Sequence, residues 1–296
     1  MIKIRRIVID TDIGDDIDDA LAIVLALNSP ELEVVGLTTV YKNTNLRTKL
    51  ALQLLKAYGR LDIPVATGIG SPLFGGTDTD SIPCQWAEEY HDIALNCDQH
   101  AADFLIDQIR RDPQVTIAAI GPLTNIACAV MKAPEVMRQA DIVIMGGMYS
   151  AFYPEWNIMC DPEAAKIVFA SGLKLTMVGL DVTLKCRLTE FDVDRIKRTG
   201  TSEIEFLSRL LTQWMDSSKH LPILHDPLTI AYLSHPDLLE IAPKKISVEC
   251  QGEFTRGMTV EHRDVFFDRP MAANVSAAVD VNKEAFIQLF LQRLLQ

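Results

Sequence analysis

The amino-acid sequence predicts an α/β fold in which helices cover a mainly parallel, open β-sheet. Short β-rich runs alternate along the chain with helix-like segments, and this alternation implies crossover connections between parallel strands. Several predicted strands, such as residues 116–120 and 141–145, are apolar without alternation, as expected when helices cover both faces. The 296 residues contain no fixed-period repeat and no low-complexity linker, so we expect a single domain over residues 1–296.

The predicted elements follow one another in a regular order. Strands are predicted over residues 4–10, 32–40, 63–68, 115–120, 141–147 and 173–182, and helices over 18–28, 45–59, 100–111, 123–133 and 161–172. A further helix is predicted after His225, with Asp226 as N-cap and Pro227 at the first helical position. Residues 71–98 read as a long surface loop, which in a compact domain is more often functional than idle.

The composition excludes several classes of partner. A net charge of −12 argues against a polyanion, so we expect no nucleic-acid partner and no anionic membrane. The longest uninterrupted apolar run, residues 20–27, is too short to span a bilayer, and the first apolar run stops at Asp10, too short for a signal-peptide core. The six cysteines form no C-x-x-C pair and are expected to be reduced structural thiols. These features predict a cytoplasmic protein.

Six aspartates fall within ten residues, at the end of the first strand and the start of the first helix. They are Asp10, Asp12, Asp15, Asp16, Asp18 and Asp19. Helix capping explains about two of them, and the others repel one another unless their pKa values rise or a cation binds. Oxygen donors without a Cys or His cluster favour a hard cation such as calcium or magnesium. An EF-hand loop does not fit, because its twelfth position would be Leu21 rather than glutamate.

Later strand ends carry compatible chemistry, and open parallel sheets bind their ligands there. The Gly-Pro turn after Ile120 leaves the Ile120 carbonyl free to face a metal, although an ordinary turn is the commoner interpretation. Met145 ends another strand, and Glu155-Trp156-Asn157 follows it. His225 and Asp226 open the late helix, where a lone histidine is more often structural.

Taken together, these segments resemble the inosine-uridine-preferring nucleoside hydrolase family. The matching segments are DTDIGDDIDDALAI, LTTVYKN, IGPLTNIA, IVIMGG, EWNIMCDPEAAKIVF, TMVGLDVT, HDPLTIAY and GMTV, in the family's order from residue 7 to about residue 260. The resemblance implies a Rossmann-like fold, a nucleoside substrate and hydrolysis of the N-glycosidic bond of ribonucleosides. It also implies one tightly bound calcium ion (Ca2+), a metal-bound water, and assembly into a homodimer or homotetramer.

The resemblance further implies a role for each matched residue. Asp12 would bind calcium and take a proton from the water as catalytic base, and His225 would protonate the departing nucleobase. The other metal ligands would be Asp19, Asp226 and the Ile120 carbonyl. The substrate-binding residues would be Asp18 at the ribose 2′-hydroxyl, Asn43 and Asn157 at the ribose hydroxyls, Glu155 near the 5′-hydroxyl, Met145 beside the sugar, and Asp226.

The sequence departs from the family pattern at Asp15 and Asp16, which are extra loop acids expected to be solvated, and in residues 146–154, a segment shorter than usual. Two other functions stay open. An apolar strand ending in Asp-x-Asp also fits a haloacid-dehalogenase-like phosphatase, with Asp10 as nucleophile and magnesium as the metal. A non-catalytic metal- or nucleoside-binding protein would retain the same carboxylates.

Overall fold

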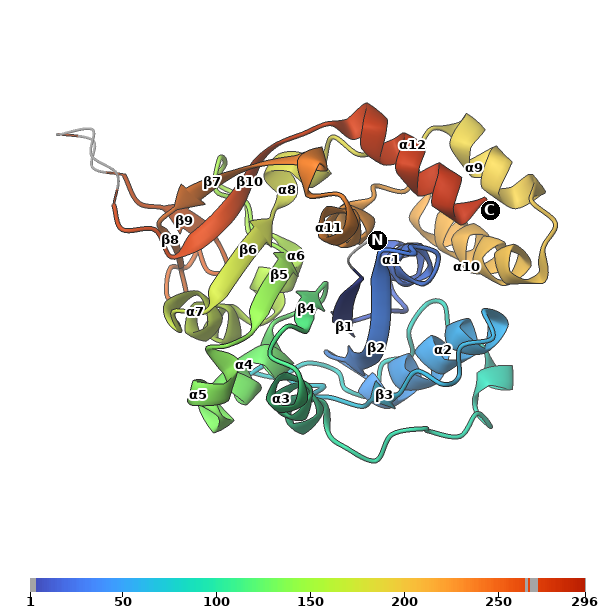
Figure 1. The fold of residues 1–296 in the computed structure, drawn as a ribbon, viewed down its shortest axis with the longest axis horizontal. Coiled ribbons are helices and arrows are strands. Elements are labelled where there is room, and N and C mark those ends of the chain that lie inside the picture. The colour runs from blue at the N-terminus through green and yellow to red at the C-terminus, as the bar shows by residue number, and fades with distance from the viewer. Residues whose placement is uncertain (1–3, 264–265, 267–270, 296) are drawn as a thin grey trace.

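An eight-stranded β-sheet forms the centre of the computed structural model, which describes residues 4–263, 266 and 271–295 (Figure 1). The strand order is β3-β2-β1-β4-β5-β6-β10-β7, and neighbouring strands are parallel except for β10 and β7. The strands are β1 Arg5–Thr11, β2 Leu32–Thr39, β3 Val65–Ala66, β4 Thr116–Ala119, β5 Asp141–Met145, β6 Lys174–Val178, β7 Leu239–Lys244 and β10 Val275–Val281, with β8 Ile246–Val248 and β9 Thr259–Glu261 forming a separate antiparallel pair. The predicted mainly parallel sheet is therefore confirmed.

Helices cover both faces of the sheet (Figure 1). They are α1 Asp18–Leu27, α2 Thr44–Ala57, α3 Ala101–Arg111, α4 Thr124–Lys132, α5 Pro134–Met137, α6 Trp156–Cys160, α7 Pro162–Ala170, α8 Leu180–Thr183, α9 Glu190–Arg198, α10 Ser202–Ser218, α11 His225–Ser234 and α12 Lys283–Leu294, with 3-10 helices η1 Glu88–Tyr90 and η2 Pro236–Leu238. Among the described residues, no helix is both long and apolar enough to cross a membrane.

Two hydrophobic clusters fill the space between the sheet and its helices. In β1, Ile7 and Ile9 belong to the cluster that includes α1, α2, α10, α11 and α12, whereas Val8 belongs to the cluster that includes α3, α4 and α7. Successive residues of a strand point to opposite faces, so the continuous apolar run of β1 contributes to both cores. This explains why the central strands show no polar alternation.

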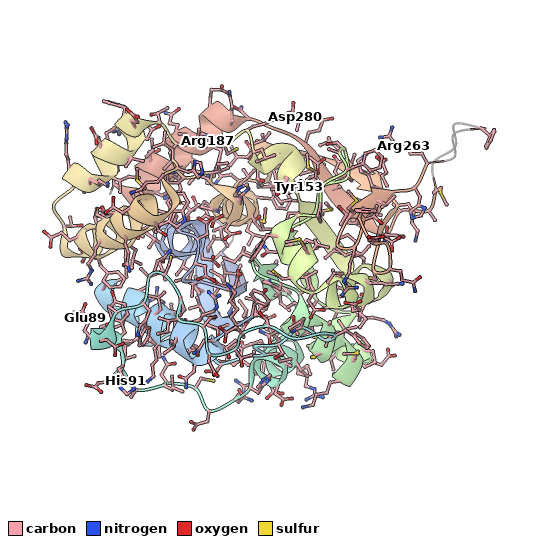
Figure 2. All side chains as sticks on the ribbon, turned by 180° about the vertical axis from the view of Figure 1, so that it is seen from behind. Glu89, His91, Tyr153, Arg187, Arg263 and Asp280 are labelled. Carbon is pink, nitrogen blue, oxygen red and sulfur yellow. The ribbon has the colours of Figure 1, made fainter. Side chains whose placement is uncertain are left out.

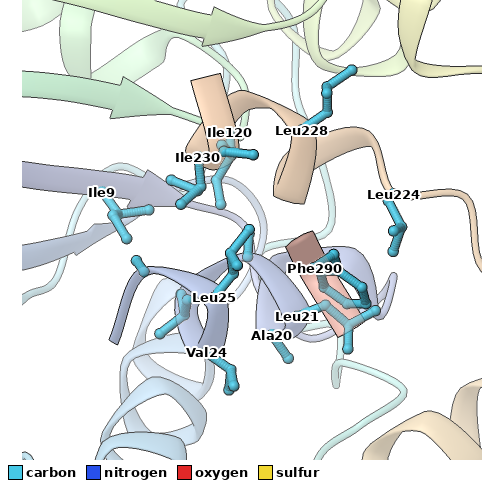
Figure 3. Close-up of a cluster of buried hydrophobic side chains, with 14 of the residues drawn as sticks. Ile9, Ala20, Leu21, Val24, Leu25, Ile120, Leu224, Leu228, Ile230 and Phe290 are labelled. Atoms are coloured by element: carbon cyan, nitrogen blue, oxygen red, sulfur yellow. The ribbon is translucent and has the colours of Figure 1, made fainter. Parts of the chain in front are cut away.

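Helix α1 is buried from Asp18 to Ala26, between the sheet and helices α11 and α12. A helix covered on all sides needs apolar residues around its whole circumference, and beyond its first turn the sequence of α1 meets that need. Figure 3 shows Leu25 of α1 and Phe290 of α12 within this cluster. Because α1 follows directly after β1, its first turn, with Asp18 and Asp19, lies at the carboxyl end of that strand.

The segment between β3 and α3 contains one short 3-10 helix, η1, and is otherwise irregular, which agrees with the loop predicted over residues 71–98. Its outer residues Glu89 and His91 lie at the periphery of the molecule (Figure 2). Its inner part returns to the loop after β1, where the Gln85 N–H donates to the Gly14 carbonyl at 2.9 Å. The segment therefore supports the start of α1 from outside.

Most predicted elements differ from the structure by a few residues at their ends, as β3 does, and two of these differences bear on the functional site. The strand predicted over residues 173–182 ends at Val178, after which the chain forms the short helix α8. Helix α11 begins at His225, with Leu224 rather than Asp226 as its N-cap. Asp226 accordingly lies in the first turn of α11, where its own N–H donates to Asp18 Oδ2 at 3.3 Å. Its carboxylate is therefore available to the functional site instead of capping the helix.

Candidate functional site

A cavity of about 830 Å³ lies at the carboxyl ends of β1, β4 and β5. Its walls come from the loop after β1, from the first turns of α1 and α11, and from the residues that follow β4 and β5. Nine of the ten residues predicted from the sequence line it, namely Asp12, Asp18, Asp19, Ile120, Met145, Glu155, Asn157, His225 and Asp226. The parallel sheet thus brings residues as far apart in sequence as Asp18 and Asp226 into one site.

Three carboxylates form the centre of this site. Asp18, Asp19 and Asp226 are buried, and one oxygen from each lies within 4.8 Å of the others. Burial, followed by repulsion from neighbouring carboxylates, raises the pKa of all three groups well above the usual range. The Thr11 hydroxyl donates to Asp19 Oδ1 and fixes its orientation. Oxygen donors at this spacing fit a hard divalent cation, which would relieve the repulsion.

Asp12 lies beside this group rather than within it. It lines the cavity, and its charge contributes to the raised pKa values of Asp18, Asp19 and Asp226. Burial is the main cause that raises the pKa of Asp12 itself, to about 6. The sequence placed Asp12 among the metal ligands and Asp18 on the sugar, whereas the structure groups Asp18 with the two predicted ligands Asp19 and Asp226.

The ends of β4 and β5 are joined by one side chain. Asn157 Nδ2 donates to the Ile120 carbonyl at 3.0 Å and to the Met145 carbonyl at 3.2 Å. Gly121 follows Ile120, and a Cβ atom at this position would lie 2.9 Å from Asp12 Oδ1. Only glycine allows the turn after β4 to approach Asp12 this closely. The Ile120 carbonyl, the predicted fourth ligand, is thereby held in the cavity wall.

Glu155 lines the cavity while it caps helix α6. Its Oε1 accepts from the Asn157 N–H at 2.9 Å, and its Oε2 accepts from the N–H groups of Gly147 and Ile158 at 2.9 and 3.1 Å. Burial nevertheless raises its pKa, despite these backbone donors. The carboxylate therefore shapes residues 147–158 as well as facing the predicted sugar site.

Asn43 is the predicted site residue that the cavity lining does not include. Its Oδ1 accepts from the Leu46 N–H at 3.2 Å and caps helix α2. Its neighbour Lys42 lines the cavity instead. In this arrangement Asn43 acts locally on α2, and its contact with ribose stays a prediction.

His225 faces the cavity from the first turn of α11. Its Nδ1 lies 2.7 Å from the Thr183 hydroxyl. Burial, with a smaller effect from the charge of Arg187, lowers the pKa of His225 to about 4. The imidazole is therefore neutral near pH 7, so it does not carry the extra proton that the resemblance implies it would transfer to the departing nucleobase. Thr183 was not identified from the sequence, since its proximity to His225 depends on the packing of α8 against α11.

Arg47 was not predicted as a site residue, and Asp15 was predicted to be solvated. Arg47 Nη2 donates to Asp15 Oδ2 at 2.8 Å, and Lys42 Nζ lies 3.1 Å from the same oxygen. Burial opposes the effect, but the Arg47 and Lys42 charges hold the pKa of Asp15 below its usual range. Asp15 is thus an ion-pair partner rather than a freely solvated acid, whereas Asp16 is exposed and accepts from the Ile17 N–H at 2.6 Å.

A sequence signal for Arg47 was present in its helical position. It lies four residues before Ala51 and seven before Leu54, on the face of α2 that is buried. A single arginine on an apolar helix face indicates either an error in the predicted face or a buried ion pair. The structure contains the buried ion pair, with the Arg47 side chain 1% exposed.

The fold and cavity define a class of α/β proteins that carry a buried, carboxylate-rich site at the carboxyl ends of parallel strands. Within that class, the chain belongs to the inosine-uridine preferring nucleoside hydrolase family, whose pattern matches residues 7–288. The resemblance seen in the sequence is therefore confirmed.

Known relatives match along nearly the whole chain. The chain is 37% identical to the pyrimidine-specific ribonucleoside hydrolase RihA of Citrobacter koseri, over 97% of both proteins. It is 36% identical to the same-named protein of Enterobacter sp. (strain 638), over 98% of this chain and 97% of that protein. Among solved structures, a plant nucleoside hydrolase, PpNRh1, superposes with a TM-score of 0.85 at 31% identity, with 98% of each chain covered. A purine-preferring ribonucleoside hydrolase from Gardnerella vaginalis superposes with a TM-score of 0.85 at 30% identity, also with 98% of each chain covered.

The raised carboxylate pKa values predict how the metal-free protein responds to pH. Burial raises the pKa of Asp10 to about 7 and that of Asp12 to about 6, from 3.8 for an ordinary aspartate. The folded chain then holds protons that the unfolded chain releases, so stability falls as the pH rises from about 4 through 7, by on the order of 3 kcal/mol for Asp12 alone. An added divalent cation should raise the Tm of EDTA-treated protein more at pH 8 than at pH 5, as measured by calorimetry.

A matched pair of variants isolates the site in this experiment. Asp226→Asn should remove most of the cation-induced rise in Tm, whereas Asp194→Asn, on the exposed face of α9, should retain it. An equal rise in Tm at both pH values, or a rise that survives Asp226→Asn, contradicts the assignment of these carboxylates to a cation site.

Proposed function

We propose that this chain is a calcium-dependent hydrolase that cleaves the N-glycosidic bond of ribonucleosides to release the free base and ribose. One observation supports this proposal above the others: a single cavity collects the carboxylates, the carbonyl and the histidine that the family resemblance assigns to this chemistry. Family membership and the names of relatives along the full chain support the same activity.

In this proposal Asp12, Asp19, Asp226 and the Ile120 carbonyl hold calcium, and Asp18, Asn157 and Asn43 bind the ribose hydroxyls. The oxygen-only donor set and the close spacing of Asp18, Asp19 and Asp226 support a hard cation at this place. When bound, calcium supplies a Lewis acid that lowers the pKa of water and can bind ribose hydroxyls. Met145 and Glu155 would complete the wall beside the sugar.

Asp12 is proposed as the general base. A general base must be ionised at the working pH. In the metal-free protein burial brings the pKa of Asp12 to about 6, and a bound cation would lower it further. The carboxylate is then ionised at pH 7 and able to take a proton from the attacking water. Cleavage of the C–N bond builds positive charge on the sugar, which the surrounding carboxylates stabilise.

His225 is proposed to assist departure of the base as a neutral hydrogen-bond donor. With a pKa of about 4 the imidazole carries no positive charge at pH 7. If the Thr183 hydroxyl donates to Nδ1, the single ring proton lies on Nε2. A donor there offsets the negative charge that develops on the departing nucleobase.

Pyrimidine ribonucleosides are proposed as the preferred substrates, after the relatives that match at the higher identity. The RihA proteins, which match at 36 to 37% identity, are named pyrimidine-specific, whereas the structural relative at 30% identity is named purine-preferring. We also propose one domain over residues 1–296, a cytoplasmic location and a homodimeric or homotetrameric assembly, all of which rest on the sequence and the family resemblance.

The phosphatase alternative is disfavoured by the position of Asp10. Its side chain is fully buried, accepts from the Thr38 hydroxyl and from Asn125 Nδ2, and does not line the cavity. A nucleophile in that place could not reach a phosphate ester in the cavity. Only a measurement of hydrolytic activity distinguishes the proposed enzyme from a non-catalytic metal- or nucleoside-binding protein.

The activity experiment uses purified, calcium-loaded protein with uridine, cytidine, inosine and a nucleoside 5′-monophosphate. We expect free ribose and free base from at least one unphosphorylated nucleoside. Asp12→Asn should lower kcat at least 1,000-fold, on the order of the loss when a general base is removed together with charge stabilisation. Phosphate release without ribose, or near-normal turnover in Asp12→Asn, contradicts the proposal.

The role of His225 is tested by varying the leaving group. His225→Ala should slow uridine hydrolysis at least tenfold more than hydrolysis of 4-nitrophenyl riboside, because the nitrophenolate leaves without a proton donor. Thr183→Val should also slow uridine hydrolysis more than hydrolysis of 4-nitrophenyl riboside. Thr183→Ser keeps the hydroxyl, so its rates should resemble those of the original protein. Equal decreases in the hydrolysis rates of both substrates would show that His225 does not assist departure of the leaving group.

A further inference from the structure

The loop between β1 and α1, residues 12–17, is held by donors from outside it. We call these residues the carboxylate loop, since they link Asp12 to Asp18. Arg47 Nη1 donates to the Asp12 carbonyl and, at 2.8 Å, to the Ile13 carbonyl. On the other side, the Gly14 carbonyl accepts from the Gln85 N–H at 2.9 Å, and the Asp16 carbonyl accepts from Gln85 Nε2 at 2.5 Å. The loop is thus fixed between α2 and the long segment after β3.

Arg47 donates four hydrogen bonds within this region. Besides its two loop carbonyls, its Nε donates to the Tyr41 carbonyl at 2.8 Å and its Nη2 to Asp15 Oδ2 at 2.8 Å. A buried guanidinium without partners would be strongly destabilising, and its planar set of N–H donors holds these four acceptors in a fixed arrangement. Because the guanidinium is planar, it binds these acceptors from different directions simultaneously, which a lysine ammonium on a flexible stem does less well.

The turn after β2 is held by the same arginine in a rarely adopted conformation. Tyr41 and Lys42 have φ angles of 68° and 56°, in the left-handed region that costs non-glycine residues on the order of 1–3 kcal/mol each. Their N–H groups donate to the carbonyls of Ile69 and Gly70 at 2.8 and 2.7 Å. This turn places Lys42 in the cavity wall, where its ammonium pairs with Asp15.

Asp15 joins these two loops across the cavity rim. Its Oδ2 accepts from Arg47, which is buried, and from Lys42, which is partly exposed. The Asp15 side chain is itself 41% exposed, so it can be changed with little disturbance of the core. Arg47 and Lys42 supply positive charge next to a group of carboxylates, and each cation offsets the repulsion among those carboxylates.

We propose that Arg47, with Asp15 as its counterion, is a positioning residue for ribonucleoside hydrolysis that fixes the main chain of Asp12 so that its carboxylate faces the cavity. This inference rests on the proposed function. Arg47 itself touches no reacting atom; it acts through the Asp12 and Ile13 peptides. Displacement of a catalytic group by about 1 Å can lower the rate on the order of 100-fold. A loosened loop should therefore lower kcat strongly and change KM much less.

The test compares Arg47→Lys with Arg293→Lys. Arg293 of α12 is also largely buried and pairs with Glu31 at 2.6 Å, but it lies at the amino end of β2, away from the cavity. We expect Arg47→Lys to lower kcat by about 10- to 100-fold with KM changed less than about threefold. Amide hydrogen exchange in residues 12–17 should accelerate at least tenfold in the metal-free protein. Arg293→Lys should lower Tm but change neither kcat nor exchange in the loop.

A second variant keeps the test decisive if Arg47→Lys does not fold. Asp15→Asn removes the counterion and retains the shape of the side chain, and it should lower kcat about 3- to 10-fold with faster loop exchange. Normal kcat despite faster exchange would mean that Arg47 is only structural and would overturn the inference, as would unchanged exchange. Absence of ribose release by the unaltered protein would instead refute the proposed function itself.

Discussion

Several aspartate carboxylates lie close together in a largely buried site, and the rest of the site depends on how their mutual repulsion is relieved. Oxygens of Asp18, Asp19 and Asp226 lie within 4.8 Å of one another. Like charges at such distances in a low-dielectric interior must be neutralised by protons or by cations. The amino ends of α1 and α11 favour negative charge, and Arg47 contributes a buried positive charge. A divalent cation would supply what remains.

The parallel sheet makes this concentration of charge possible. The carboxyl ends of β1, β4 and β5 lie side by side, so the loops that follow them meet although they are far apart in sequence. Helix α1 packs directly against α11, which places Asp18 and Asp226 together. Hydrogen bonds then fix the cavity wall, for example those that the Asn157 side chain donates to the carbonyls at the ends of β4 and β5.

The fold and the cavity were largely predictable, because they depend on apolar runs and on strand-end motifs that are local in sequence. Arg47 and Thr183 were not identified, since their partners Asp15 and His225 lie on other elements and only tertiary packing brings them close. Asn43 matched a family asparagine, but its oxygen is bonded within its own helix. The sequence likewise did not reveal the low pKa of His225, which depends on how deeply α11 is packed.

A crystal structure of the protein with calcium and a ribose-like inhibitor would show directly whether these carboxylates hold the ion beside the sugar. We expect one calcium ion with carboxylate oxygens of Asp19 and Asp226 at about 2.3–2.6 Å, together with Asp12 and the Ile120 carbonyl. The sugar hydroxyls should meet the ion and Asp18. An ion bound elsewhere, or an inhibitor bound outside this cavity, would contradict the proposed calcium and ribose site.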